Sequence, residues 1–120
     1  MRTPFEVAES YWAAECRRDI EAVMAHYHPD ATYQDAGGLL RGHAEIRTFY
    51  EESKRAYPGL EVRITREFHS ESPDCSALQV EAVLIDAEGK RFGIKGLNVA
   101  TVRDGKLVSL RCFEDPLTPE

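Results

Sequence analysis

The sequence lacks any long apolar run, and no stretch approaches the roughly 20 consecutive apolar residues that a membrane-spanning helix needs. It is also short of positive charge, because 15 Lys and Arg residues face 21 Asp and Glu residues and leave a formal net charge of -6. Acidic proteins repel phosphate backbones and anionic lipids, so we expect neither a nucleic acid nor a membrane as a partner. Glu6 and Glu9 precede any apolar stretch, which argues against a secretory signal.

Cysteine is scarce and has no motif spacing. Cys16, Cys75 and Cys112 are odd in number and lie far apart, without the CxxC pattern of zinc sites and redox motifs. We therefore expect reduced thiols in a cytoplasmic protein. His26 and His28 lie two residues apart and point to different faces, and no third ligand has metal-binding spacing. Neither a metal nor another cofactor is expected.

What is present suits one folded domain over residues 1–120, with 42% hydrophobic and 30% charged residues. The first half has helical spacing. Thr3 begins a capping-box pattern before a first helix, and Asp19 has the position of a second cap, opening a short helix with Tyr27 on its inward side. A third helix follows Gly42 and ends before Pro58.

The second half alternates between apolar and polar residues, which is the period of β-strands. Strands are predicted at 60–68, 76–86, 91–103 and 106–114. The Asp104-Gly105 pair is typical of a type I′ hairpin turn, which matches strand twist. Helices followed by an antiparallel meander predict an α+β fold with the helices on one face of a curved sheet.

The segment 30–50 carries the chemistry-bearing pattern of the chain. A β-like stretch bends at Asp35, passes a Gly-Gly turn and continues into the third helix. A carboxylate at the mouth of an apolar pocket loses hydration, which raises its pKa and suits it to act as a base. The alternative is a turn aspartate that caps local backbone amides.

The residues at the joints of these elements form a set that spans nearly the whole chain. In order they are Tyr11, Asp19, Ile20, Glu21, Ala22, Asp30, Ala31, Thr32, Asp35, Gly42, Ile46, Phe49, Tyr50 and the segment 105–111. This set resembles the NTF2-like superfamily and, within it, the SnoaL-like and ketosteroid-isomerase-like proteins. The resemblance implies an α+β cone, in which a curved antiparallel sheet packs against N-terminal helices and encloses a pocket.

The resemblance also implies three catalytic positions. Asp35 matches the general base of the isomerases, and Tyr11 matches the tyrosine that donates a hydrogen bond to the developing enolate oxygen. Asn98 falls where the isomerases have a protonated aspartic acid as a second donor, and its amide donates without any pKa shift. The other readings are a core tyrosine for Tyr11 and a fixed polar network for Asn98.

The implied ligand is a small hydrophobic compound, steroid-like or polyketide-like, in a cofactor-independent reaction. Its predicted contacts are Trp12, Tyr27, Phe49, Val83, Leu110, Cys112 and Glu114. Ala36 replaces the proline that usually follows the base, and Glu114 makes the pocket more polar than a steroid site. Family members often dimerise through the outer sheet face, which here would present Lys95, Leu97, Val99 and Thr101.

Two other functions stay open at this point. Cyclase-type relatives place the working carboxylate on a late strand, which would make Glu114 the reacting group and Asp35 a bystander. A non-catalytic ligand-binding domain would keep the cavity and release its ligand unchanged.

Overall fold

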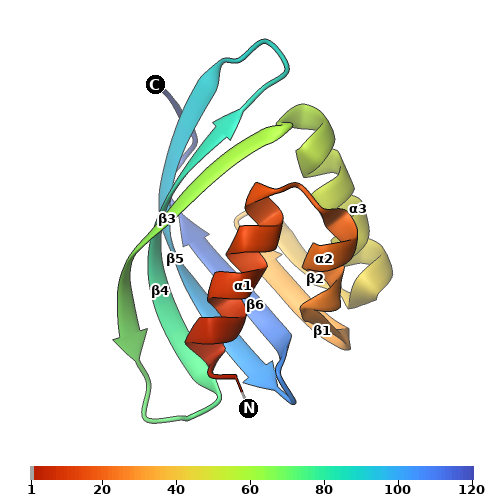
Figure 1. Ribbon diagram of the computed structural model, residues 1–120, viewed down its shortest axis with the longest axis vertical. Coiled ribbons are helices and arrows are strands. Elements are labelled where there is room, and N and C mark those ends of the chain that lie inside the picture. The colour runs from red at the N-terminus through yellow and green to blue at the C-terminus, as the bar shows by residue number, and fades with distance from the viewer. Residues whose placement is uncertain (1) are drawn as a thin grey trace.

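The computed structural model describes residues 2–120, and its helices lie on one side of a strongly curved sheet (Figure 1). The helices are α1 (Pro4–Cys16), α2 (Ile20–Ala25) and α3 (Gly42–Ala56). The strands are β1 (Tyr27–Asp35), β2 (Gly38–Arg41), β3 (Gly59–His69), β4 (Cys75–Ile85), β5 (Arg91–Arg103), β6 (Lys106–Glu114) and β7 (Thr118–Pro119). The predicted α+β architecture is confirmed.

The sheet has the order β2-β1-β6-β5-β4-β3, and β7 lies beside β5. Neighbouring strands are antiparallel except for β1 and β6, which run parallel. The strands β3 to β6 agree with the sequence prediction to within one residue at each end. Asp104 and Gly105 have φ values of 55° and 76°, so the predicted hairpin turn is present.

The predicted helix caps are confirmed. The Thr3 hydroxyl accepts a hydrogen bond from the Glu6 amide at 3.1 Å, and the Glu6 carboxylate accepts one from the Thr3 amide at 2.8 Å. The Asp19 carboxylate accepts from the Ala22 amide at 3.1 Å. These bonds satisfy amides that the first turn of each helix leaves unpaired.

The prediction that Tyr27 belongs to the second helix is wrong. The helix ends at Ala25, and Tyr27 is the first residue of β1, opposite Leu107 of β6. Pro29 lacks an amide hydrogen and disfavours helical geometry in the residue before it, so the helix cannot continue. The Leu107 amide instead donates to the His26 carbonyl at 2.7 Å, which joins the chain to the sheet.

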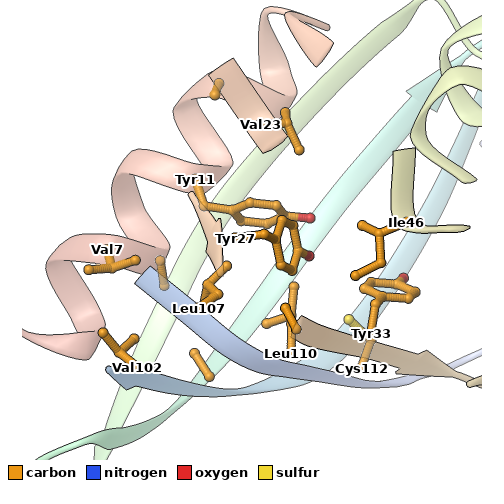
Figure 2. Close-up of a cluster of buried hydrophobic side chains, with 14 of the residues drawn as sticks. Val7, Tyr11, Val23, Tyr27, Tyr33, Ile46, Val102, Leu107, Leu110 and Cys112 are labelled. Atoms are coloured by element: carbon orange, nitrogen blue, oxygen red, sulfur yellow. The ribbon is translucent and has the colours of Figure 1, made fainter. Parts of the chain in front are cut away.

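The core lies between the concave face of the sheet and the helices (Figure 2). Val7 and Tyr11 of α1 meet Val102, Leu107 and Leu110 of the strands, and all are at most 7% exposed. Among residues 2–120, no helix is long and apolar enough to cross a membrane. The same residues contain no group of three His, Cys, Asp or Glu side chains placed to hold a metal ion.

Gly96 marks a close approach between β5 and β6. A Cβ atom built there would lie 2.7 Å from the Phe113 carbonyl oxygen and 2.9 Å from the Glu114 Cγ atom. At Gly93 on the same strand, the nearest atom to an added Cβ is 3.9 Å away. The two glycines therefore form a matched pair for testing the strand geometry.

We expect Gly96→Ala to lower the free energy of unfolding by about 1–3 kcal/mol, because the new methyl group has to displace backbone atoms. Gly93→Ala is expected to be neutral or slightly stabilising, because alanine restricts the unfolded chain without a clash. Urea denaturation of both variants measures the difference. Equal stabilities would contradict the close approach of β6 to Gly96.

Candidate functional site

An apolar cavity lies between α1, α3 and the concave face of the sheet. Its volume is about 140 Å³. Most of the predicted site residues line it, namely Tyr11, Trp12, Asp35, Phe49, Asn98, Cys112 and Glu114. Asp35, Phe49 and Glu114 also line a larger hollow beside the turn between β1 and β2, so the cavity opens on that side.

Three other predicted contacts lie outside this wall. Val83 lines a cleft on the outer face of the sheet, and its neighbours Ala82 and Leu84 take the cavity side because side chains alternate along a strand. Tyr27 and Leu110 are 0% and 1% exposed and lie in the core behind the wall. Tyr27 reaches the cavity only through a hydrogen bond to another tyrosine.

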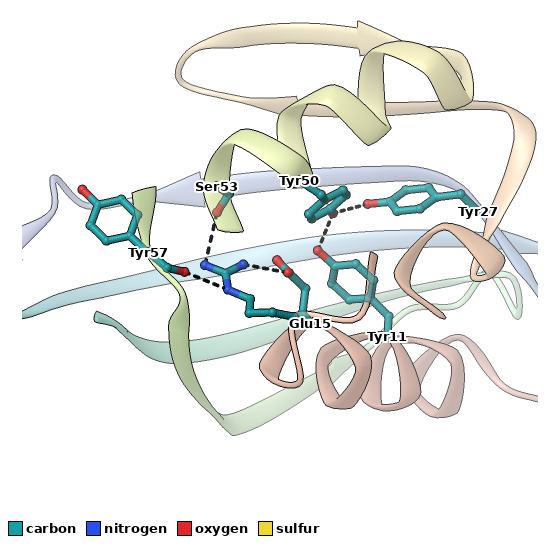
Figure 3. Close-up of polar contacts among 7 residues, drawn as sticks. Tyr11, Glu15, Tyr27, Tyr50, Ser53 and Tyr57 are labelled. Carbon is teal, nitrogen blue, oxygen red and sulfur yellow. Dashed lines mark hydrogen bonds and ion pairs between the residues drawn. The ribbon is translucent and has the colours of Figure 1, made fainter. Parts of the chain in front are cut away.

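That bond is part of a chain of three buried tyrosine hydroxyls (Figure 3). The Tyr50 hydroxyl lies 2.5 Å from the Tyr11 hydroxyl and 2.6 Å from the Tyr27 hydroxyl. The three residues come from α3, α1 and β1, and none is more than 2% exposed. Two hydrogen bonds among three O–H groups leave one proton free to donate elsewhere.

Burial raises the pKa of Tyr11, Tyr27 and Tyr50, because the phenolate form would lose its hydration. All three phenols are therefore neutral donors at physiological pH. When Tyr27 donates to Tyr50 and Tyr50 donates to Tyr11, the Tyr11 proton is left for an acceptor in the cavity. A chain of this kind polarises its terminal O–H group and strengthens it as a donor.

Asn98 lies on β5 with its side chain on the concave face, and it is 1% exposed. The indole Nε1 of Trp12 donates to the Asn98 Oδ1 atom at 3.0 Å. An indole nitrogen only donates, so this bond fixes which end of the amide faces Trp12. The Asn98 NH₂ group is consequently directed away from Trp12 and is a second donor of the cavity wall.

Asp35 ends β1 at the cavity opening, and both of its carboxylate oxygens accept hydrogen bonds. The Gly37 amide donates to Oδ1 at 2.7 Å, and the Tyr33 hydroxyl donates to Oδ2 at 3.1 Å. The first bond is the turn-capping contact expected of an aspartate in this position. The second orients the carboxylate from the cavity side, so the turn contact and the cavity position coexist.

Glu114 is the second carboxylate of the opening, and it lies opposite Gly96 in the register of β5 and β6. Burial raises the pKa of Glu114, and the negative charge of Asp35 raises it further. Glu114 therefore binds a proton more readily than an ordinary glutamate. The missing side chain at Gly96 leaves room for the Glu114 side chain at this point.

Sequence reasoning missed four polar residues of the wall, namely Glu15, Tyr33, Tyr50 and Ser53. Tyr50 shares the apolar stripe of its helix, and nothing in the pattern indicated the hydroxyl chain. Glu15 follows Tyr11 by four residues, so helical spacing places both on one face. Its pairing with Arg18 has no signal in the sequence.

A model of the SnoaL-like domain matches residues 8–110. No curated protein matches the sequence. Solved structures with the same fold include the Δ5-3-ketosteroid isomerase of a Mycobacterium species, which has a TM-score of 0.88 and 20% identity, covering 99% of this chain and 100% of the other. At such low sequence identity, the similarity shows that the two proteins share a fold.

Other similar structures have different functions. The epoxide hydrolase/cyclase-like enzyme SalBIII has a TM-score of 0.86 at 18% identity and covers 98% of this chain and 95% of its own. An LEH-like epoxide hydrolase from M. tuberculosis has a TM-score of 0.81 at 22% identity, covering 93% of this chain and 82% of the other. The fold thus accommodates isomerase and hydrolase chemistry, and only the wall residues can separate them.

The buried thiol of Cys112 tests the apolar character of the wall. Burial raises the pKa of Cys112 to about 12, and the neighbouring Glu114 charge adds to the effect. Because the thiolate is the reactive form, we expect native Cys112 to react with iodoacetamide at pH 8 at least about a hundredfold more slowly than an ordinary thiol. Peptide mass spectrometry, with the half-buried Cys75 as internal comparison, measures the rates.

In guanidinium chloride all three cysteines should react alike. Rapid labelling of Cys112 in the native protein would contradict a dry cavity wall.

Proposed function

We propose that this chain, which belongs to the SnoaL-like domain family, transfers a proton next to the carbonyl group of a small hydrophobic compound without a cofactor. The observation that carries the proposal is the convergence of one carboxylate and two neutral donors on one apolar cavity. Asp35, Tyr11 and Asn98 come from β1, α1 and β5 and line the same space. A carbon acid needs a base at its proton and donors at its oxygen.

The reaction would proceed in two steps. The Asp35 carboxylate removes a proton from the carbon next to the carbonyl group, and the C–H electron pair moves into an enolate. Tyr11 and Asn98 donate hydrogen bonds to the enolate oxygen, where the negative charge gathers. Protonated Asp35 then returns the proton to another carbon of the enolate, which gives an isomer of the substrate and restores the base.

Each donor has a partner that orients it. Trp12 holds the oxygen of the Asn98 amide at 3.0 Å, and Tyr50 contacts the Tyr11 hydroxyl at 2.5 Å. Donors that are already oriented need no reorganisation as charge develops, which is the main source of such stabilisation.

We expect Asp35→Asn to lower the rate of proton transfer by about 10²- to 10⁴-fold, because an amide has no basic site. The amide oxygen still accepts from Gly37, so the turn and the thermal melt should be nearly unchanged. The measurement is the isomerisation of a β,γ-unsaturated 3-ketosteroid, together with exchange of its α-protons in D₂O. Asp30→Asn, an exposed site on the same strand, is the matched control.

The outcomes separate the three functions. Full activity of Asp35→Asn would overturn the base assignment. If Glu114→Gln instead abolishes turnover, the cyclase-type reading is favoured, which the raised pKa of Glu114 supports independently. If the wild-type protein binds the steroid and neither isomerises it nor exchanges its protons, a ligand-binding domain is favoured.

We further infer that the chain forms a homodimer through the outer face of the sheet. The helices leave this face uncovered (Figure 1), and Leu97 and Val99 are only partly buried on it. Phe113, opposite Leu97 on β6, is 50% exposed. An apolar centre with charged neighbours such as Lys95 is typical of a protein interface.

A charge at the centre of this face should separate the subunits, because an unpaired buried carboxylate opposes association. We expect Val99→Glu to shift the protein from dimer to monomer in sedimentation velocity at micromolar concentration. Thr48→Glu on the exposed side of α3 should leave the mass unchanged. A wild-type protein that sediments as a monomer would contradict the inference.

A further inference from the structure

A buried ion pair lies at one side of the cavity. Its residues are separate in sequence from Asp35 and Asn98, and the proposed reaction does not use them. Glu15 and Arg18 are 6% and 4% exposed, and the Arg18 Nη1 atom donates to Glu15 Oε1 at 2.9 Å. Two charged groups inside a small domain are costly unless every polar atom has a partner. The partners of each group therefore indicate what the pair does.

Arg18 is fully engaged by the protein. Its Nε atom donates to the Tyr57 carbonyl at 3.0 Å, and its Nη2 atom donates to the Ser53 hydroxyl at 3.3 Å (Figure 3). Its backbone has a φ of 53°, a left-handed conformation that residues other than glycine rarely adopt. The arginine thus joins the end of α1 to the end of α3 and has no nitrogen left for a ligand.

Glu15 is engaged on one side only. Arg18 holds Oε1, and Oε2 makes no hydrogen bond to any residue in the described part of the chain. Glu15 is nevertheless a wall residue of the cavity, and residues 2–120 contain no sealed side-chain oxygen or nitrogen without a partner. The Oε2 atom therefore opens into the cavity as a free acceptor, in a side chain more than nine-tenths buried.

The position of this acceptor is set by α1. Glu15 follows Tyr11 by four residues, about one helical turn and about 6 Å along the axis, and both side chains project from α1 toward α3 (Figure 3). Leu60, Val80 and Leu84 line the same cavity. An acceptor in apolar surroundings gains most from a ligand that brings a donor.

We propose that Glu15, held by Arg18, is a second polar subsite, which accepts a hydrogen bond from a hydroxyl group of the ligand one helical turn from the Tyr11 hydroxyl. The inference rests on the proposed function for its first anchor, the oxygen bound by Tyr11 and Asn98. The substrate class is thereby narrowed to a flat hydrophobic carbonyl compound or its enol that carries a second hydroxyl group. A compound with an ether or carbonyl oxygen at that place is rejected, because two acceptors would face each other.

The electrostatics of the pair support this assignment. Burial raises the pKa of Glu15, and the Arg18 charge opposes the increase. A hydroxyl donor from the ligand would replace hydration that Oε2 has lost.

The test compares 2-naphthol with 2,6- and 2,7-dihydroxynaphthalene and with 6-methoxy-2-naphthol by isothermal titration calorimetry. All four compounds carry one hydroxyl group that can accept hydrogen bonds from Tyr11 and Asn98, and they differ in the substituent on the second ring. We expect at least one dihydroxynaphthalene to bind the wild-type protein roughly tenfold more tightly than 2-naphthol, as one hydrogen bond to a charged acceptor provides. The methoxy compound should bind no more tightly than 2-naphthol.

Two variants test the role of Glu15. In Glu15→Leu/Arg18→Gly, both charges are removed together and glycine accommodates the left-handed backbone, so the fold should survive. The affinity ratio of dihydroxynaphthalene to 2-naphthol should then fall to about one. In Glu15→Gln, Arg18 still claims the amide oxygen, so the NH₂ group faces the cavity and the preference should turn toward the methoxy compound.

The exposed pair of Glu21 and Arg47 supplies the matched control, and Glu21→Gln/Arg47→Gln should keep the wild-type ratios. If 2-naphthol binds but no second hydroxyl improves its affinity in wild type, the subsite is overturned and the proposed function stands. A gain that persists in Glu15→Leu/Arg18→Gly overturns it as well. If 2-naphthol fails to bind at all, the proposed function and the subsite are overturned together.

Discussion

The structure depends on how three phenol groups are satisfied inside an apolar core. Tyr11, Tyr27 and Tyr50 each bury a hydroxyl group, and a buried hydroxyl without a partner costs on the order of 1–3 kcal/mol. Their two mutual bonds remove that cost and join α1, β1 and α3 at one point. When Tyr27 donates to Tyr50 and Tyr50 donates to Tyr11, the one unmatched proton lies next to the cavity, so a requirement of packing also provides a hydrogen-bond donor.

Two polar groups of the cavity, Asn98 and Glu15, are oriented by partners that can only donate hydrogen bonds. An indole can only donate and a guanidinium can only donate. Trp12 therefore turns the Asn98 amide to present its NH₂ group, and Arg18 turns Glu15 to present a bare oxygen. The wall thus offers donors at one place and an acceptor at another, without any charged donor inside the cavity.

Much of the fold, and the position of several site residues, could be predicted from local sequence patterns. The Asp104-Gly105 turn defined the ends of two strands, and the alternation of β5 placed Asn98 on the concave face. Both signals can be read from the sequence because turn chemistry and strand period are local properties. Tyr27 was misplaced because helical spacing continued past the point where pairing with β6 takes over. Val83 was misplaced because the parity of β4 does not reveal which face the helices cover.

The contacts that carry the chemistry are of another kind. The Glu15–Arg18 pair depends on a left-handed backbone at Arg18 and on Tyr57, which is 39 residues away in the chain. The bond between Trp12 and Asn98 spans 86 residues. No periodicity encodes such pairings, because they arise only when the helices have packed on the sheet. Composition and spacing therefore indicated the candidate residues but not their partners.

The contact between Trp12 and Asn98 has a spectroscopic consequence. The chain contains a single tryptophan, and its indole forms part of the wall while its nitrogen holds the amide. Tryptophan emission from the protein therefore originates at the cavity itself, and its wavelength follows the local polarity there. Binding of any molecule in the cavity therefore becomes visible as a change in an intrinsic optical signal, without a dye or an attached label.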